Sequence, residues 1–461
     1  MSKTFQSFEE HNYRLWFTGS LFASSGQWMQ RVAQDWLVLT VLTRGGGLEM
    51  GVVTALQFLP ILLFSPWAGL AADRFERRRL LQITQSLMMI FGFSLGFLIL
   101  TGRIELWMVY ILAFAGGTVL AFENPVRQSF VSELVAPRML PNAVALNSTA
   151  FNSARLIGPA LSGLIIDMVG MGWVFVVNGA LLTVPIVTLA LLRTEDLNIL
   201  PKVPRQKGQL REGFQYIMGR RDIVLILFLM GVVSCFGLNF QITSALMATQ
   251  IFDIPAGGYG LMSSFLAIGA ICGSLVVARS NNPRLQLIIA AALFFGVALG
   301  LLALSPTYWW FLLIAIPTGA LSMTLISSAN AAVQISTAPQ FRGRVMAIYS
   351  MIFLGTTPIG APIVGWIGEQ YGARWSMGIG AIITIVAALI AALWGILAWK
   401  IRLQWDGYHL PRLNIPGQAA LSDTRDDGEP AGEKSAGDAF SSEGALGAQV
   451  ESEMEEEELK D

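Results

Sequence analysis

Apolar residues fill twelve long stretches between residues 15 and 399, and most charged residues lie in the short segments between them. Each stretch approaches the roughly 20 apolar residues with which a helix crosses the hydrocarbon core of a bilayer. Lipid offers no partner for backbone polar groups, so segments of this kind must be helical. The pattern predicts membrane-spanning helices over residues 15–43, 50–72, 80–101, 105–122, 144–166, 173–192, 223–247, 259–277, 285–304, 308–330, 345–367 and 375–399.

Basic residues predict how these spans are oriented. If the N-terminus is cytoplasmic, 25 of the 30 Lys and Arg residues fall in cytoplasmic segments and three, Arg44, Arg103 and Arg374, fall in outer loops. Short cytoplasmic loops are enriched in Lys and Arg, so this bias favours two cytoplasmic termini and an even number of spans. We expect a multi-pass protein of the cell's inner (plasma) membrane, inserted without a cleavable signal peptide.

A repeat divides the chain into two halves. When residues 128–173 are shifted by 202 positions onto residues 330–375, 12 of the 46 positions are identical without a gap. The longest loop lies between spans six and seven and contains two prolines, as linkers do. We therefore expect an all-α membrane protein of two pseudo-symmetric six-helix bundles, residues 1–192 and 223–400, joined by a cytoplasmic linker, residues 193–222. Parallel repeats of this kind place a substrate site between the halves at mid-membrane.

The loop after span two combines a glycine, an Asp-Arg pair and further arginines. Asp73 can lie near the positive N-terminus of a neighbouring helix, and Arg77 can reach an acid at the cytoplasmic end of span four, where Glu123 is placed. Such a cluster would hold the cytoplasmic face shut and release it during transport. The alternative is that the arginines only set the topology. The predicted latch comprises Gly69, Asp73, Arg74, Arg77, Arg78 and Glu123.

This loop resembles the signature between spans two and three of the major facilitator superfamily, although Glu76 stands where that family usually has glycine. The resemblance extends over residues 10–400. It implies a twelve-helix transporter that works by alternating access and is not an enzyme.

Span five contains a smooth face of small residues with a proline beside it. It is similar to the span-five motif of exporters in this superfamily that exchange substrate for protons, with Ser162 in place of a glycine. The alternative is tight helix packing with no directional meaning. The motif residues are Ala154, Gly158, Pro159, Ser162 and Gly163.

Charged residues also lie inside spans one and five, where they are costly and mark a pathway or a partner. Arg31 and Asp35 are spaced as an i,i+4 pair, and Arg155 adds a second arginine. Asp35 is the first candidate for a proton carrier, with Arg31 and Arg155 as partners. Desolvation favours its neutral form, whereas a nearby arginine favours its carboxylate. The alternative is a static buried ion pair.

Other polar residues inside the spans are candidates for lining the cavity, although for each one a hydrogen bond between helices is the competing interpretation. They are Gln27, Gln34, Gln57, Asn152, Asn178, Asn239 and Tyr349.

Three segments resemble the bacterial exporter branch that includes enterobactin and macrolide efflux proteins: residues 12–36, 122–125 and 154–163. This likeness implies proton-coupled export of a siderophore or drug. Alternatives are an importer or lipid mover on the same fold and, more remotely, a membrane enzyme or scaffold. Expected partners are a small-molecule substrate, the proton and the lipid bilayer, with the protein a monomer.

Several features are absent from the sequence. No basic face for nucleic acid, P-loop or HExxH motif is present, so we expect no nucleic-acid partner, cofactor or metal. Residues 401–461 are rich in Ser, Gly and acid, which predicts a cytoplasmic, largely disordered tail.

Overall fold

A computed structural model describes residues 3–198, 209–278, 285–399, 403–404 and 412–413. Residues 1–393 belong to one compact unit, and the described residues from Trp394 onward belong to a second. The predicted acidic tail lies almost entirely outside the described residues. Its described part is a short antiparallel pair, β1 (Leu403–Gln404) and β2 (Arg412–Leu413).

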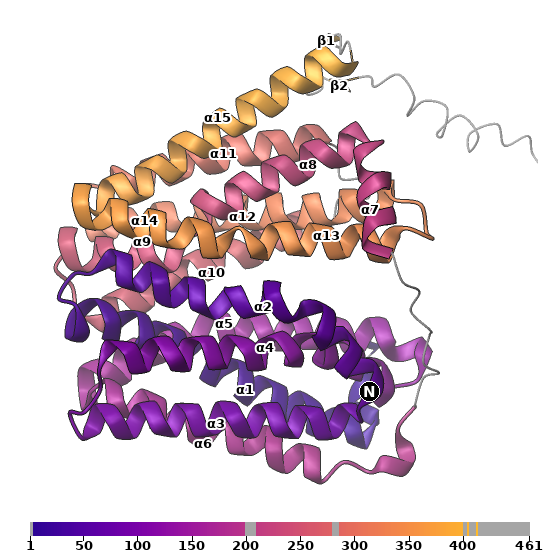
Figure 1. Cartoon of the computed structure of the whole chain (residues 1–461), viewed down its shortest axis with the longest axis vertical. Helices are drawn as coiled ribbons and strands as arrows, with labels where there is room; N and C mark the ends of the chain where they lie inside the picture. Colours follow the sequence, from indigo (N-terminus) through magenta and orange to yellow (C-terminus); the bar gives the residue numbers. More distant parts are fainter. Residues whose placement is uncertain (1–2, 199–208, 279–284, 400–402, 405–411, 414–461) are drawn as a thin grey trace, which may run out of the picture. The chain divides into compact units, whose positions relative to one another are not determined.

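Helices make up nearly all of the described chain (Figure 1). The first six long helices are α1 (His11–Trp36), α2 (Gly47–Arg74), α3 (Arg77–Leu100), α4 (Leu106–Leu134), α5 (Leu140–Val169) and α6 (Met171–Ala190). The later helices are α7 (Gln209–Met218), α8 (Arg221–Val232), α9 (Phe240–Leu246), α10 (Ala256–Ala278), α11 (Leu285–Ala303), α12 (Tyr308–Ser336), α13 (Arg342–Gly355), α14 (Thr357–Tyr371) and α15 (Ala373–Trp399).

Short helical turns link several of these elements. Three are 3₁₀ turns: η1 (Lys3–Glu9), η3 (Pro137–Met139) and η4 (Thr194–Asp196). Three are π-helical turns: η2 (Leu37–Leu42), η5 (Val233–Gly237) and η6 (Met247–Ile251). π-Helical turns widen the hydrogen-bond ring and occur often at functional sites.

The helices pack in two groups. In the first, α1 contacts α5 and α6, α2 contacts α4, and α3 contacts α4 and α6. In the second, α10 and α11 contact α12, and α14 contacts η5 and α9. Small residues at the crossings let backbones approach, as is usual where lipid supplies no hydrophobic drive between helices.

Helix bounds in the two groups repeat with one shift of 202 residues. The shift maps α4 onto α12 at both ends, and it maps α5 onto the combined length of α13 and α14. Gly170 and Gly372 occupy equivalent turns with φ of 92° in both cases, a left-handed conformation that glycine adopts without a Cβ clash. The repeat therefore extends to backbone conformation.

The two groups contact one another along α2 with α14 and along α5 with α10. A Cβ on Gly365 would collide with the backbone of Gly47, and a Cβ on Gly163 would lie 2.5 Å from the carbonyl oxygen of Ala256. We call this end of the unit, where α2 and α10 begin and α5 and α14 end, the closed end.

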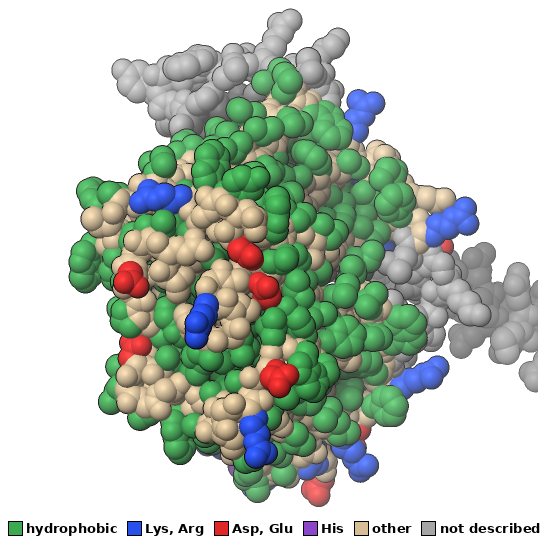
Figure 2. Space-filling model, turned by 60° about the vertical axis from the view of Figure 1, so that its left-hand side comes forward, with side chains coloured by type: hydrophobic (Ala, Val, Ile, Leu, Met, Phe, Trp, Pro, Cys, Tyr) green, Lys and Arg blue, Asp and Glu red, His purple; other side chains and the backbone are tan. Residues whose placement is uncertain are grey.

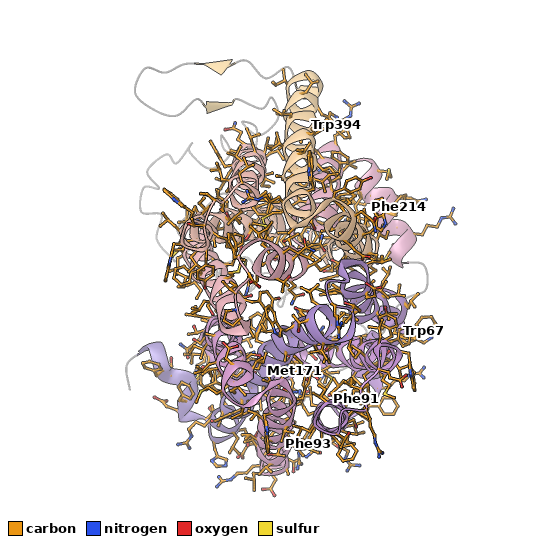
Figure 3. All side chains as sticks on the ribbon, turned by 90° about the vertical axis from the view of Figure 1, so that its left-hand side faces the viewer. Trp67, Phe91, Phe93, Met171, Phe214 and Trp394 are labelled. Atoms are coloured by element: carbon orange, nitrogen blue, oxygen red, sulfur yellow. The ribbon has the colours of Figure 1, made fainter. Side chains whose placement is uncertain are left out.

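A largely apolar surface surrounds the helices. Figure 2 shows hydrophobic side chains over much of this face, with charged side chains scattered among them. Trp67 and Phe214 are more than half exposed, and Figure 3 shows them on the outside of their helices. Ten helical segments of the described chain are long and apolar enough to cross a membrane. α1 and α5 are not among them; both contain charged and polar residues within their length.

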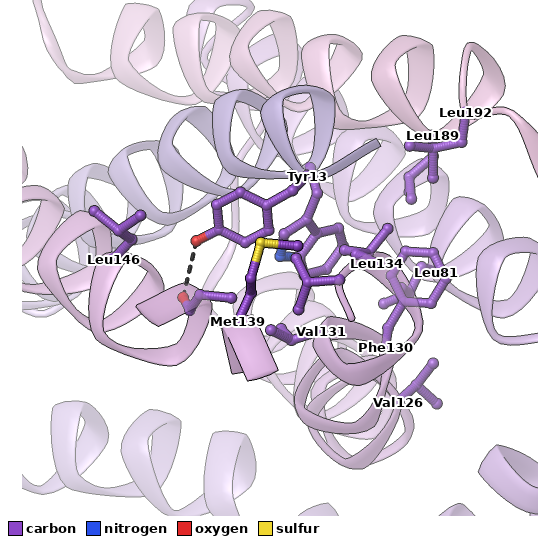
Figure 4. Close-up of a cluster of buried hydrophobic side chains, with 13 residues drawn as sticks. Tyr13, Leu81, Val126, Phe130, Val131, Leu134, Met139, Leu146, Leu189 and Leu192 are labelled. Atoms are coloured by element: carbon purple, nitrogen blue, oxygen red, sulfur yellow. Dashed lines mark hydrogen bonds between the residues drawn. The ribbon is translucent and has the colours of Figure 1, made fainter. Parts of the chain in front are cut away.

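A compact apolar cluster anchors the start of α1 (Figure 4). Tyr13 is fully buried there, and its hydroxyl donates a hydrogen bond of 2.8 Å to the carbonyl oxygen of Ala143 on α5. Trp16 packs edge-on against Phe130 of α4. The cluster fixes α1 against α4 and α5 at the end opposite the closed end.

Some predicted boundaries differ from the structure. Span four was expected over residues 105–122, but α4 continues through Pro125 to Leu134. A proline removes one backbone donor without ending a helix whose other contacts hold it. The expected linker contains η4 and α7, and span eleven is divided at Thr356 into α13 and α14.

Adding a methyl group at the closed end should destabilise the protein. We expect Gly365→Ala to lower stability by about 1–3 kcal/mol through overpacking. Gly378→Ala is the matched control, because a Cβ at Gly378 on α15 meets nothing within 4 Å. Thermal denaturation of the purified variants measures the difference, and a Gly365→Ala midpoint at or above that of Gly378→Ala would contradict the packing described.

Candidate functional site

Asp35 lies in the last turn of α1, at the contact between the two helical groups. Its side chain is only 3% exposed. The hydroxyl of Tyr259 on α10 donates to Asp35 Oδ2 over 3.1 Å, and the ring of Tyr259 stacks on Trp36 with centroids 5.7 Å apart. One carboxyl thus connects α1 of the first group to α10 of the second.

Tyr259 has a second acceptor within reach. Its oxygen lies 3.2 Å from the carbonyl oxygen of Gln241 on α9. When Asp35 is ionised, the tyrosine proton can point to the carboxylate. When Asp35 is protonated, the carboxyl can donate to the tyrosine oxygen while the tyrosine donates to Gln241. Both forms of Asp35 therefore have a hydrogen-bond partner in this environment, where an unpaired polar group is costly.

Arg31 does not form the expected ion pair with Asp35. Among the described residues no carboxylate oxygen lies within 4.0 Å of its guanidinium. The guanidinium instead lies over two aromatic rings, 5.2 Å from the centroid of Trp28 and 5.7 Å from that of Phe58. Spacing along a helix brings two residues to one face, but the aromatic neighbours and Tyr259 decide where each side chain turns.

Arg155 reaches the same tryptophan from α5, with its guanidinium carbon 5.6 Å from the centroid of Trp28. The structure thus brings Arg31 and Arg155 together around one ring, which we call the arginine pair. Both side chains are partly exposed.

The polar residues of α1 and α5 differ in their contacts. The side-chain amide nitrogens of Gln27 and Gln34 are buried without an acceptor among the described residues. Asn152 donates to the carbonyl oxygen of Ser148 within its own helix. The glutamines therefore retain unused donors near the arginine pair.

The other cavity candidates sit among packed helices. Asn178 is fully buried and donates to Gln30 between α6 and α1. Asn239 donates to the carbonyl oxygen of Cys235 at the break between η5 and α9. Tyr349 is buried and stacks on Phe353, and Gln57 is partly buried on α2 with its backbone against Gly117.

The small residues of α5 face two different partners. Ser162 donates to the carbonyl oxygen of Met29 over 2.8 Å, and Gly158 lies against Trp28. Ala154 is buried on the same helix. Pro159 and Gly163 instead lie against α10 across the boundary between the groups. The motif thereby places α5, and Arg155 with it, against α1.

Arg77 of the predicted latch forms an ion pair with Glu133 at the end of α4. The sequence analysis expected Glu123 to be the partner of Arg77, and the structure corrects this to Glu133. Because α4 continues to Leu134, Glu133 lies at its end near the start of α3, where Arg77 begins the helix.

Glu123 pairs elsewhere. It accepts hydrogen bonds from Arg127, one turn along α4, over 2.6 Å and from Gln85 on α3 over 2.7 Å. Arg78 donates to the carbonyl oxygens of Leu189 and Ala190 at the end of α6. These contacts lie within the first helical group.

The remaining latch residues belong to the last turns of α2. Gly69 is buried and Arg74 is exposed, and the side chain of Asp73 lies outside what the structure describes.

Two carboxylates form hydrogen bonds between the two helical groups at the closed end. Asp167 of α5 accepts a hydrogen bond of 2.9 Å from the backbone nitrogen of Gly257 at the start of α10. Glu369 of α14 accepts one of 3.1 Å from Leu48 at the start of α2. The two acids occupy positions related by the same shift of 202 residues, and each lies at a helix N-terminus, where negative charge is stabilising.

Sequence analysis did not identify Tyr259, Glu133, Asp167 or Glu369. The repeat aligns Asp167 with Glu369 and was a signal for that pair. The contact between Asp35 and Tyr259 joins residues 224 positions apart, and no local pattern indicates it.

Long apolar helices that bury charged groups where two helical groups meet define a membrane-spanning transporter. The family model described as transmembrane secretion effector matches residues 2–415, and the chain belongs to this family of the major facilitator superfamily. It is therefore a transporter and not an enzyme.

Several curated relatives are transporters. The chain is 24% identical to the staphyloferrin A transporter of Staphylococcus aureus over 82% of its own length and 94% of the relative. It is 26% identical to the multidrug efflux pump Tap of Mycolicibacterium fortuitum, covering 77% and 88% of the two chains. For macrolide efflux protein A of Streptococcus pyogenes the identity is 20%, over 74% and 86%.

Solved structures share the fold at low identity. A bacterial homologue of the human lysosomal transporter Spinster, in an inward-facing and unoccupied conformation, superposes with a TM-score of 0.68 at 12% identity. The superposition covers 83% of this chain and 96% of that one. A D-xylose-proton symporter gives a TM-score of 0.63 at 15% identity, over 82% and 95% of the two chains.

A double-mutant cycle should identify the partner of Arg77. We expect Arg77→Gln and Glu133→Gln to couple by about 1–3 kcal/mol in unfolding free energy, because each leaves the other group without its partner in a poorly solvated place. Arg77→Gln with Glu123→Gln is the matched cycle and should be close to additive. Stronger coupling in the second cycle would restore Glu123 as the partner.

Proposed function

We propose that this protein is a proton-coupled exporter of small amphipathic molecules, working by alternating access in the inner (plasma) membrane. The observation that carries the proposal is the buried carboxyl of Asp35, bonded to Tyr259 where the two helical groups meet. The names of the relatives, which include a siderophore transporter and drug efflux proteins, support a siderophore or drug as substrate.

Twelve spans in two six-helix bundles are the topology that fits this function. Ten segments meet the criteria for a span, and α1 and α5, with 26 and 30 residues, are long enough to be the other two. Polar residues inside a span are tolerated where they face the protein interior. The repeated helix bounds support bundles of residues 1–192 and 223–400 related by pseudo-symmetry.

The basic residues support cytoplasmic termini, and the closed end then faces outward. Four hydrogen bonds of described residues join the groups: Leu48 to Glu369, Gly257 to Asp167, Tyr259 to Asp35, and Ser264 to the carbonyl oxygen of Leu156. The first three lie at the closed end. These contacts support a conformation in which the outward end is shut.

Asp35 acts in this scheme as the proton carrier. It takes up a proton from outside when the closed end opens and releases it to the cytoplasm after the groups have rocked back. Tyr259 accompanies the change because it can donate to either Asp35 or Gln241. The carboxyl remains hydrogen-bonded in both protonation states, so neither state is trapped by an unpaired buried group.

Two sets of charges would alternate as latches. Asp167 and Glu369 hold the closed end by bonding helix N-termini of the opposite group. Asp73, Arg74 and their neighbours hold the cytoplasmic end when the closed end opens. In the present conformation Arg77 and Arg78 contact only their own group among the described residues.

Replacing the carboxyl of Asp35 should remove the transport that the proton gradient drives. In inside-out vesicles, export appears as uptake. Staphyloferrin A and a macrolide, the compounds named for two relatives, are both tested, and we expect Asp35→Asn to abolish acidified-lumen-driven uptake of whichever one the wild type carries. Tyr259→Phe should retain part of the activity, because the carboxyl still titrates without its partner.

Asp253→Asn is the matched control, since Asp253 is exposed and asparagine tolerates its positive φ of 45°. Wild-type gradient-driven uptake by Asp35→Asn would eliminate Asp35 as the carrier. If the wild type transports none of the tested compounds, proton release by the purified protein on addition of a siderophore, present in the wild type and lost in Asp35→Asn, replaces the readout.

Weakening the two acids at the closed end should open it. Spin labels at Leu48→Cys and Tyr371→Cys, with both native cysteines replaced by alanine, report the distance between α2 and α14. We expect the combined Asp167→Asn and Glu369→Gln change to shift the distance distribution to larger values, because neutral side chains interact more weakly with helix N-termini. Asp253→Asn again serves as the control, and an unchanged distribution would show that the acids do not hold this end.

A further inference from the structure

Arg31 of α1 and Arg155 of α5 both place their guanidinium groups over the ring of Trp28. Their guanidinium carbons lie 5.2 Å and 5.6 Å from the centroid of Trp28. α1 and α5 are held in register there by Ser162, which bonds the backbone of Met29, and by the close approach of Gly158 to Trp28. The arginine pair is therefore positioned by backbone packing and not by flexible loops.

Within the described part of the chain, no acid lies within ion-pair distance of either guanidinium group. Among the described residues neither one donates a hydrogen bond or forms an ion pair. Asp35 is the nearest acid along α1, and its carboxyl is engaged by Tyr259. Positive charges at membrane depth are costly unless they are paired, so two of them beside a single engaged carboxyl leave a net requirement for negative charge.

Two neighbouring glutamines add further hydrogen-bond donors. The amide nitrogens of Gln27 and Gln34, one turn before and after Arg31, are buried without acceptors among the described residues. Four side chains along α1 and α5 thus offer N–H groups. A ligand that satisfies them must be rich in hydrogen-bond acceptors.

Aromatic rings border the same place. Phe151 packs edge-on against Trp28 at 5.9 Å and remains 46% exposed, and Phe58 of α2 lies under Arg31. These faces can contact an apolar or aromatic body. A guanidinium stacked on a ring keeps its N–H groups directed outward, where they bind a carboxylate through two parallel hydrogen bonds.

We propose that Arg31 and Arg155 bind the acidic group of the exported molecule, so that the substrate is an amphipathic organic anion. Its acidic group is a carboxylate, and its apolar body rests on Trp28 and Phe151. This inference rests on the proposed function and narrows it, because two arginines repel the lipophilic cations that many drug exporters carry.

Matched small probes test the charge requirement directly. Salicylate is an aromatic anion near neutral pH, salicylamide is its neutral counterpart, and tetraphenylphosphonium is a lipophilic cation. Equilibrium dialysis of each radiolabelled probe against the purified full chain measures binding. We expect salicylate to bind more tightly than salicylamide and to be displaced by citrate, with tetraphenylphosphonium the weakest of the three.

Arginine variants assign the binding to the arginine pair. Arg31→Gln and Arg155→Gln should each weaken salicylate binding by about tenfold to a hundredfold, the loss expected for a charge-assisted hydrogen bond, and should leave salicylamide binding within about twofold. Arg155→Lys should recover part of the affinity because it keeps the charge. Arg103→Gln, at an exposed loop position, is the matched control.

Folding is monitored separately, by size-exclusion profile and thermal denaturation without probe, so that a misfolded variant is recognised. Should Arg155→Gln misfold, the comparison of Arg155→Lys with Arg31→Gln carries the test. Equal binding of salicylate and salicylamide by the wild type, or wild-type salicylate affinity in both glutamine variants, would overturn the inference.

The outcomes also separate this inference from the proposed function. Gradient-driven uptake of a neutral or cationic drug that survives both arginine changes would contradict the anion site and leave proton-coupled export intact. Selective anion binding by a protein whose transport ignores the proton gradient would support the site and contradict the proposed coupling.

Discussion

A hydrogen bond from Tyr259 to Asp35 joins the two helical groups where neither residue has access to bulk water. This contact matters because both residues are buried among apolar groups. Apolar surroundings penalise an unpaired carboxyl, yet Tyr259 can serve the ionised and the protonated form because Gln241 offers it a second acceptor. A group that is paired in both states can exchange a proton without unfolding its surroundings. The contact brings together α1, α9 and α10.

Close packing at the closed end supplies the precision that such a contact needs. Glycines let the backbones of α2 and α14, and of α5 and α10, come into direct contact. Across the same boundary, Asp167 and Glu369 accept hydrogen bonds from backbone amides at the starts of α10 and α2. Each acid–amide bond contributes little alone, on the order of 1 kcal/mol. Balanced small terms suit a transporter, because a conformation held too strongly would not exchange with its alternative.

Sequence patterns predicted the helical membrane fold, the family and most helix positions. They could do so because the thickness of the membrane and the energetic cost of unpaired backbone groups in lipid constrain every span. Partners were harder to predict. Arg31 was expected beside Asp35 but lies over Trp28, and Arg77 bonds Glu133 where Glu123 was expected. Helical spacing places residues on a face, whereas the choice among neighbours depends on residues brought from distant spans. Tyr259 illustrates this limit, since nothing near it in sequence indicates α1.

Infrared difference spectroscopy of the purified protein during a pH titration tests the central claim most directly, because a protonated carboxyl has its own C=O absorption. The account predicts a band that appears on acidification, disappears in Asp35→Asn, and shifts in frequency in Tyr259→Phe as its hydrogen bond is lost. A titrating band that survives unchanged in Asp35→Asn would assign the exchanged proton to another group and contradict the account.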